Sequence, residues 1–200
     1  MADADAPVPA EEKKTVQTAG EIAADIARRR QRVRGLITLL KDPNLNNRWH
    51  AAELLGPERD PEAVGPLIEA LKDPFVDVQW LAARSLGEIG DLRALGPLLD
   101  ATTSDSQWLR AGAASGLGKL KDPRAVERLL VLLKDKKTRV RKEAAGALGS
   151  IADKRAVPGL TEALNDPDAG VRDAAGKALE SLKNNPVKPD PDTTPVQPAQ

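Results

Sequence analysis

The sequence predicts an all-α solenoid built from five helix-pair repeats of 31 residues each. Leucines recur at this constant spacing, at Leu36, Leu67, Leu98, Leu129 and Leu160. A second set of leucines recurs in step with the first, at Leu55, Leu86, Leu117, Leu148 and Leu179. A fixed spacing of this length is typical of a repeat protein, in which each repeat buries its apolar face against its neighbours.

Each repeat contains two amphipathic helices. The first is short, at 63–71 in one repeat and 125–133 in another, with apolar residues three and four apart. It ends at a Lys-Asp-Pro or Asn-Asp-Pro turn, where Asp can cap the following helix and Pro suits its first turn. The second helix begins near Val78, Val140 or Val171 and runs through an Ala-Ala pair to a Leu-Gly pair.

Small residues recur in the second helix. An alanine occupies one position in all five repeats, at Ala51, Ala82, Ala113, Ala144 and Ala175. Alanine at a helix contact lets two helix axes approach to about 8 Å. Four glycines follow the second leucine set, at Gly56, Gly87, Gly118 and Gly149. These glycines either serve a packing contact or end the helix, and the sequence leaves both interpretations open.

Charged residues also recur. The second helix carries Arg48, Arg110, Arg141 and Arg172, with Gln79 at the equivalent place in one repeat. The loops carry Asp60, Asp91, Asp122 and Asp153, often with an arginine two residues later. Bidentate pairs between arginine and carboxylate could join the loop of one repeat to the next. Because these charges recur with the repeat, we interpret them as structural rather than catalytic.

The repeats resemble a known family. The pattern Asp-Pro-x-x-x-Val-Arg-x-x-Ala-Ala-x-Ala-Leu-Gly-x-Ile-x-Asp-x-Arg-Ala-Val, clearest at 134–157 and 73–95, is similar to the HEAT-like repeat of the phycobilisome-lyase type. The resemblance extends from residue 36 to about residue 182. It implies antiparallel helix pairs stacked as a right-handed α-α superhelix, with the second helices lining the concave side. Five copies make the pattern specific for fold but not for function.

Three segments are expected along the chain. Residues 1–20 are predicted to be a disordered N-terminal extension, because they show no apolar periodicity. Residues 21–185 are predicted to form the solenoid, with 21–35 as an N-terminal capping helix whose apolar stripe includes Ile22, Ile26 and Val33. Residues 186–200 are predicted to be a proline-rich disordered tail that serves as a spacer.

Two repeats depart from the pattern. In the first, Gly56 and Pro57 should stop the second helix early, because proline disrupts a helix interior. The third lacks the Lys-Asp-Pro turn and contains Gly112 and Gly116, so we expect it to be the loosest link in the stack.

Composition limits the classes of function. The chain has 30 Lys and Arg against 30 Asp and Glu, so its net charge does not favour nucleic acid or an acidic membrane. It has no Cys, which excludes disulfides, thiolate metal sites and cysteine nucleophiles. No apolar stretch approaches the roughly 20 residues of a membrane span, and no secretory signal is evident. We therefore expect a soluble, cytoplasmic and monomeric protein.

The candidate site lies on the second helices. Trp49 and Trp80 occupy the same repeat position, and Trp108 lies one turn earlier in the next repeat, so all three fall off the core stripe on one face. Exposed tryptophans are enriched at protein-binding hot spots. The competing interpretation is that each indole fills a gap in an alanine-rich core. The predicted partner-binding residues on this face are Trp49, His50, Trp80, Leu81, Arg84, Trp108 and Lys142.

Two alternatives remain. The basic clusters at 28–34 and 134–142 could contact phosphates, although solvated helix faces are the favoured interpretation. The family resemblance also leaves open a bilin-lyase-like enzyme or subunit. The chain carries no recognisable nucleophile or phosphate-binding motif, and His50 is its only histidine. We therefore predict a non-enzymatic scaffold that binds a protein or peptide, with no catalytic residue, metal or cofactor.

Overall fold

The computed structural model describes residues 18–184, and the regular structure in this range is entirely helical, as predicted. Its α-helices are α1 (Ala19–Leu39), α2 (Leu45–Glu58), α3 (Val64–Ala70), α4 (Val76–Ile89), α5 (Leu95–Ala101), α6 (Gln107–Leu120), α7 (Val126–Leu132), α8 (Thr138–Ile151), α9 (Val157–Ala163) and α10 (Ala169–Asn184). A single 3-10 turn precedes each of α3, α5, α7 and α9. The chain divides into two units after Arg32, within α1, and the repeats belong to the second unit.

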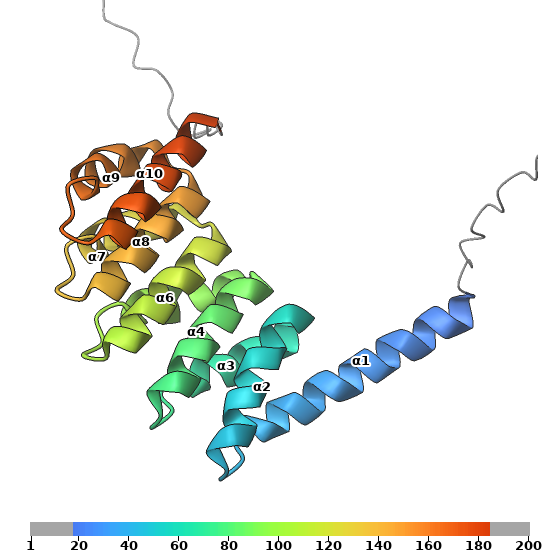
Figure 1. The fold of residues 1–200 in the computed structure, drawn as a ribbon. Helices are drawn as coiled ribbons and strands as arrows, with labels where there is room; N and C mark the ends of the chain where they lie inside the picture. Colours follow the sequence, from blue (N-terminus) through green and yellow to red (C-terminus); the bar gives the residue numbers. More distant parts are fainter. Residues whose placement is uncertain (1–17, 185–200) are drawn as a thin grey trace, which may run out of the picture. The chain divides into compact units, whose positions relative to one another are not determined.

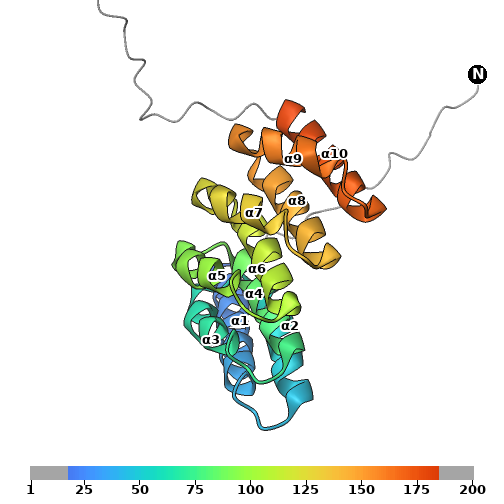
Figure 2. The same ribbon diagram turned by 90° about the vertical axis from the view of Figure 1, so that its left-hand side faces the viewer.

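The repeats form two helical layers (Figure 1). The long helices α2, α4, α6, α8 and α10 pack side by side in one layer, and each short helix packs on the long helix that follows it. Figure 2 shows α3, α5, α7 and α9 in the other layer. Between the layers, Leu67, Leu98, Leu129 and Leu160 from the short helices and Leu55, Leu86, Leu117 and Leu148 from the long helices are completely buried. These eight leucines of the two sets therefore lie at the centre of the core, while Leu36 is 9% exposed and Leu179 is partly buried at its edge.

Helix α1 differs from the separate capping helix that the sequence predicts. It continues through Gly35 to Leu39, so the expected cap and the first helix of the first repeat are one element. A Cβ at Gly35 would meet open space. One glycine lowers the stability of a helix by only about 1 kcal/mol relative to alanine, so α1 can continue through Gly35. Val33 is buried, whereas Ile22 and Ile26 of the expected stripe are 46% and 49% exposed.

The predicted end segments lie mostly outside the described residues. Residues 1–17 of the expected extension and all of the proline-rich tail at 186–200 are not described. Ala19 and Gly20, which the sequence assigns to the extension, already belong to α1. None of the described helices is both long enough and apolar enough to cross a membrane.

Helix α2 does not stop early, which corrects the prediction for the first repeat. It continues through Pro57 to Glu58 and has 14 residues, as do α4, α6 and α8. Proline removes one backbone hydrogen bond, the one that would reach the carbonyl of Glu53. Glu53 is exposed, so water can satisfy that carbonyl, and the helix continues for one more residue.

The four recurring glycines serve packing contacts rather than helix ends. A Cβ at Gly118 would lie 2.6 Å from the Ala147 Cα, and one at Gly149 would lie 2.7 Å from the Ala178 Cα. The long helices instead end one turn later in the left-handed conformation, at Arg59, Gly90, Lys121 and Ala152. The stack therefore depends on glycine where two helix backbones touch, because no other residue fits there.

Buried ion pairs join consecutive repeats, but with aspartates other than those the sequence suggests. The Arg110 guanidinium donates from Nε and Nη2 to the two Asp135 carboxylate oxygens at 2.7 and 3.0 Å. Arg48 pairs in the same way with Asp73, and Arg141 with Asp166. These aspartates belong to the Lys-Asp-Pro, Lys-Asp-Lys and Asn-Asp-Pro turns of the next repeat. We call each such contact an inter-repeat ion pair.

The loop aspartates of the sequence pattern act within their own repeats. Asp60, Asp91, Asp122 and Asp153 each cap the 3-10 turn that follows, by accepting a backbone hydrogen bond. The side-chain hydrogen bond from Arg155 holds the pKa of Asp153 below its usual range, although burial opposes it. Arg155 also donates to the carbonyl of Pro123 at 2.9 Å, so the arginine, and not the aspartate, reaches the preceding repeat.

Candidate functional site

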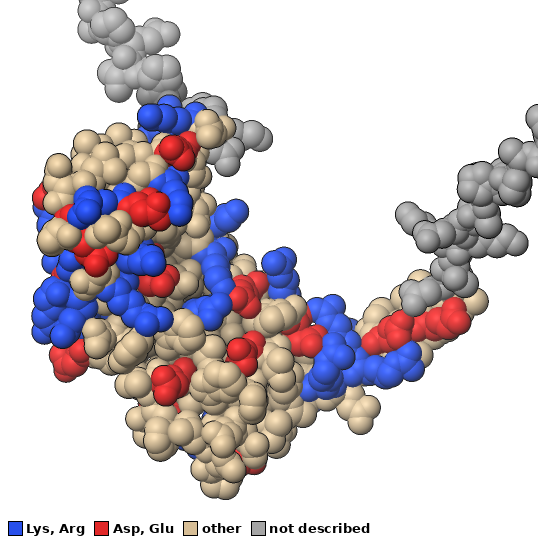
Figure 3. All heavy atoms as spheres, in the orientation of Figure 1, with Lys and Arg blue, Asp and Glu red and all other residues tan. Residues whose placement is uncertain are grey.

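The predicted site lies on the layer of long helices, and we call its solvent side the second-helix face. Trp49, Trp80 and Trp108 come from α2, α4 and α6, three helices that are adjacent in this layer. In Figure 3, Lys and Arg side chains gather over the C-terminal repeats, whereas the surface over α4 is mostly uncharged. The repeat register therefore places three indoles beside one another, next to a more basic region.

Trp49 and His50 form the N-terminal part of this face. Their rings meet edge to face with centroids 4.9 Å apart, and His50 is exposed while Trp49 is half-buried. An edge-to-face pair leaves part of the indole face available to a further apolar group. Both residues lie on the predicted face, and Trp49 also packs in part against the core, so the gap-filling interpretation applies to it in part.

Trp80 is partly a packing residue. It leans towards α6, where a Cβ at Gly112 would lie 3.0 Å from both the ring Cδ1 and the backbone carbonyl oxygen of Trp80. Its indole Nε1 is buried and has no hydrogen-bond partner among the described residues. Gly112 therefore makes room for the indole, and the gap-filling interpretation applies to this tryptophan in part.

Trp108 is the most exposed of the three indoles, with 39% of its surface accessible. Arg139 lies on the same face, in the first turn of α8. Its guanidinium lies 4.5 Å from the centre of the Trp108 ring and 5.6 Å from the centre of the Trp80 ring. Arg84 lies 4.7 Å from the Trp80 ring centre. We call Arg84, Trp80, Arg139 and Trp108 the Arg–Trp stack. Cation–π contacts of this kind fix otherwise flexible arginine side chains.

Arg139 is absent from the predicted set, although a signal for it exists. It lies 31 residues after Trp108, at the equivalent repeat position, and on an exposed part of α8. Its contact with Trp80, two helices away, is not visible in the sequence because it requires small residues on the intervening helix α6. Gly112 meets that requirement.

Leu81 is not part of the surface, which corrects the prediction. Only 3% of it is accessible, and it packs in the core with Ala82 and Leu86. Lys142 is exposed on α8, as the sequence predicts. The second-helix face therefore includes six of the seven predicted residues.

Grooves follow the second-helix face. One of about 210 Å³ lies between α2 and α4 and is lined by Pro57, Leu81 and Arg84. A larger one of about 590 Å³ crosses the C-terminal ends of the long helices at Gly87, Gly118 and Ser150. A third, of about 440 Å³, separates α8 from α10. Shallow, connected grooves of this size suit side chains of a partner chain better than one enclosed ligand.

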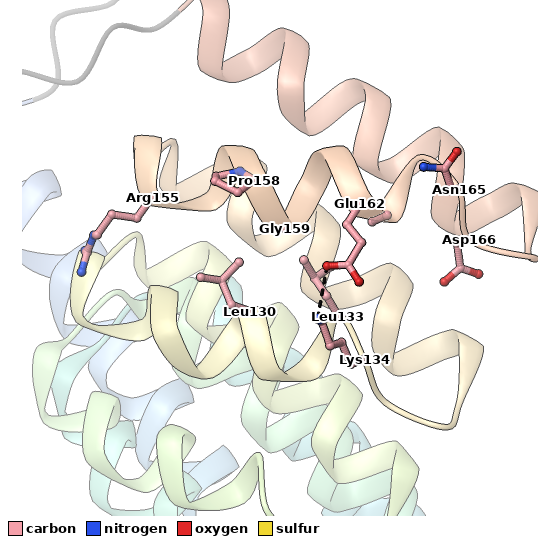
Figure 4. Close-up of a pocket in the computed structure, with 10 residues that line it drawn as sticks. Leu130, Leu133, Lys134, Arg155, Pro158, Gly159, Glu162, Asn165 and Asp166 are labelled. Carbon is pink, nitrogen blue, oxygen red and sulfur yellow. Dashed lines mark ion pairs between the residues drawn. The ribbon is translucent and has the colours of Figure 1, made fainter.

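A further groove of about 520 Å³ lies on the layer of short helices, between α7 and α9 (Figure 4). Leu130, Leu133 and Pro158 line its apolar part. The Lys134 ammonium and the Glu162 carboxylate, 3.2 Å apart, form an ion pair across it. This ion pair is exposed and therefore weak, but the residues that line the groove include no aromatic side chain, so the second-helix face is the better candidate.

Each of the two basic clusters is engaged with carboxylates in part. In the first, Arg28 pairs with Asp25, and Arg34 lies 3.3 Å from Glu62. In the second, Lys134 pairs with Glu162 and Arg141 with Asp166. Within residues 18–184, no group of three or more His, Cys, Asp or Glu side chains is arranged to hold a metal ion.

Comparison with known proteins agrees with this architecture. The model of HEAT repeats matches residues 33–115 and again 95–180. The chain belongs to the HEAT repeat family. No curated protein sequence matches it.

Solved structures show the same fold. One similar structure is a chain in the complex of CpcE and CpcF of phycocyanin lyase from Nostoc sp. PCC7120. The match covers 92% of this HEAT-repeat chain and 71% of that chain, with 25% sequence identity and a TM-score of 0.68. An engineered protein is 25% identical, with a TM-score of 0.58, over 84% and 85% of the two chains. YibA of E. coli is 26% identical, with a TM-score of 0.62, over 86% and 66%.

Proposed function

We propose that this HEAT-repeat protein is a non-enzymatic scaffold that binds a protein or peptide through the second-helix face. The observation that carries the proposal is the set of three indoles on adjacent helices α2, α4 and α6, one of them 39% exposed. Tryptophan is enriched among the residues that dominate binding energy at protein interfaces. The similarity to a phycocyanin lyase chain that occurs in a complex with another protein supports a protein partner.

The test uses Trp49 and Trp108, because Trp80 also packs against Gly112. The Trp49→Ala/Trp108→Ala double variant should lose partners captured from a lysate of the source organism, while its melting temperature stays within about 3 °C of wild type. Leu164→Ala is the matched control, since this residue is 40% exposed on the other layer. Equal capture by wild type and double variant, or a drop in melting temperature of many degrees, would contradict the proposal.

A second candidate is a subunit of a lyase of the phycocyanin-lyase type. It is supported by the similarity to the CpcE/CpcF structure over 92% of this chain. The purified protein is mixed with phycocyanobilin and its visible absorbance is recorded after gel filtration. Co-elution of the pigment with a shifted absorption band supports the lyase-type candidate, and pigment-free protein eliminates it.

A further inference from the structure

Among the described residues, Arg139 has no anionic partner, unlike four other arginines of the long helices, and Arg172 of α10 donates only to backbone carbonyls. Arg48, Arg110 and Arg141 are each held by an aspartate of the next repeat. Arg84, in the Arg–Trp stack, lies 3.7 Å from Glu88. Arg139 is exposed and forms no ion pair with any residue in the range 18–184, and its contacts are the rings of Trp80 and Trp108.

The two indoles restrict the position of the Arg139 guanidinium, which favours the binding of a planar anion. A guanidinium carries its N–H donors in one plane and can present two of them in parallel to a carboxylate. An unrestrained arginine side chain loses rotamer entropy when it is immobilised. The rings of Trp80 and Trp108 already restrict Arg139, so less of that entropy remains to be lost on binding.

The charges around Arg139 favour one carboxylate over a polyanion. Glu88 is engaged by Arg84 and Lys119, and Asp173 by Lys177. The same face also carries carboxylates that form no ion pair within the described range: Glu53, Asp77 and Glu143. The exposed Lys136, Lys137 and Lys142 attract any anion near Arg139. The carboxylates spread along the face, with Glu143 one turn from Arg139, repel a long chain of phosphates more than they repel a single carboxylate.

The apolar neighbours indicate what flanks that carboxylate. Trp108 and Trp80 adjoin Arg139, and Arg84 of the Arg–Trp stack lines the small groove between α2 and α4. Pro57 and the edge of the mostly buried Leu81 supply the apolar lining of this groove, and Glu53, Ser85 and Glu88 supply its polar lining. An extended peptide could therefore place apolar side chains over α2 to α6 while one of its carboxylates lies at α8.

We propose that Arg139 is the anchor for an aspartate or glutamate side chain of the partner, carried on an extended segment that also presents apolar residues to Trp108 and Trp49. This inference rests on the proposed function of the second-helix face. Lys142, exposed on the next part of α8, would add a second, less directional positive charge.

The experiment uses a displayed library of random twelve-residue peptides, selected on immobilised protein. Wild type is compared with Arg139→Ala, Arg139→Lys, the Trp49→Ala/Trp108→Ala double variant, and Arg128→Ala as an exposed-arginine control on the other layer. Wild type and Arg128→Ala should enrich peptides that combine Asp or Glu with apolar residues. Arg139→Ala should enrich apolar residues without Asp or Glu, and Arg139→Lys should retain only a weak acidic preference.

A selected peptide is then synthesised with its acidic residue intact and as the Gln or Asn analogue. The neutral analogue should bind wild type about tenfold more weakly but bind Arg139→Ala as well as the acidic form does. Binding is followed by intrinsic fluorescence, since the three tryptophans of the chain all belong to the face. Thermal melting of each variant separates lost binding from lost folding.

The outcomes separate the two proposals. Peptides that depend on Trp49 and Trp108 but show no acidic preference would overturn the role of Arg139 alone. No enriched peptide, or enrichment that persists in the double tryptophan variant, would overturn both the role of Arg139 and the proposed function. Arg139-dependent binding of a 20-nucleotide single-stranded DNA at physiological salt, without peptide binding, would show that the anion is phosphate and overturn the carboxylate.

Discussion

The junction between α6 and α8 and the junction between α4 and α6 are held together by different means. At the first, Arg110 and Asp135 form a bidentate ion pair, and their side chains are only 9% and 10% exposed. At the second, the equivalent positions hold Gln79 and Ser104. Gln79 donates only to the carbonyl of Asp73 in its own repeat, and its Oε1 has no partner among the described residues.

The α4–α6 junction has backbone contact at two glycines instead of a buried ion pair, whereas the α6–α8 junction has the Gly118–Ala147 contact in addition to its ion pair. A Cβ at Gly116 would lie 2.3 Å from the Ala83 carbonyl oxygen, and one at Gly87 would lie 2.3 Å from the Gly116 carbonyl oxygen. Gly112 receives Trp80 in the same interface. The sequence predicts a loose third repeat from Gly112 and Gly116, whereas the structure shows that these glycines allow close packing. Looseness itself stays a prediction that stability measurements can test.

The comparison shows that the α4–α6 junction lacks both the arginine and the aspartate of the inter-repeat ion pair, and not one of them alone. Losing arginine alone would leave a buried carboxylate without a counter-charge, which costs more than the pair contributes. Gln79 and Ser104 are neutral, so neither leaves a buried charge. The α4–α6 junction therefore depends on packing and on the partly exposed Lys119–Glu88 ion pair, without a buried one.

The largest expected effect comes from breaking the ion pair at the α6–α8 junction. Arg110→Ala should lower the free energy of unfolding by about 3 kcal/mol, because it leaves Asp135 buried and unpaired. Gln79→Ala, at the equivalent position, should cost about 1 kcal/mol or less. Urea unfolding followed by circular dichroism measures both. Similar losses for the two variants would mean that the junctions do not differ in this way.

A second prediction concerns the backbone contact at the α4–α6 junction. Gly116→Ala should lower the free energy of unfolding by about 1–3 kcal/mol, because the added Cβ meets a backbone oxygen that cannot move aside. Gly146→Ala is the control, since a Cβ there meets open space within α8, and it should raise stability by about 0.5–1 kcal/mol. Stabilisation by both substitutions would contradict the packing role of Gly116.

Restoring the absent ion pair should have a smaller effect. In a double-mutant cycle of Gln79→Arg and Ser104→Asp, the coupling free energy should be stabilising by about 1 kcal/mol. Each single variant should be neutral or destabilising, since it introduces a charge without its partner. Equilibrium unfolding of wild type, the two single variants and the double variant measures the coupling. Additive effects would show that the α4–α6 geometry cannot accommodate the pair.

The smallest expected effect is on pH dependence. Burial is the largest single influence on Asp135 and raises its pKa. The hydrogen bonds from Arg110 and the Lys137 backbone, with the charges of Arg110 and Lys136, together outweigh burial, so the pKa lies below the usual value of 3.8. A lowered folded-state pKa stabilises the protein above pH 3.8, and this stability is lost as the pH falls further. Without Arg110, burial dominates and protonation of Asp135 becomes favourable. The destabilisation by Arg110→Ala should therefore be smaller at pH 3 than at pH 7, and an unchanged difference would argue against the ion pair.

The candidate site shows how much of a surface can be predicted from the 31-residue spacing of the repeats. The spacing alone placed Trp49, Trp80 and Trp108 on one face, and Lys142 beside them. It failed for Leu81, which is adjacent to Trp80 in sequence but turns into the core. Successive helical residues are separated by about 100°, so a neighbour of an exposed residue can be buried. It included Arg139 in the basic cluster at 134–142 but not among the partner-binding residues, because its contacts with the rings of two other helices are not visible in the sequence.

By itself, the sequence determined the repeat length, the two helices of each repeat, the two leucine sets of the core and the family resemblance. These properties follow from local periodicity, because the apolar spacing of one chain segment defines its own helix and buried side. Only the tertiary structure decided which aspartate each arginine reaches, which glycines touch a neighbouring backbone, and that Arg139 lies against Trp80 across α6. Those contacts depend on the distance and rotation between helices, which arise from the packing of whole repeats rather than from any one segment.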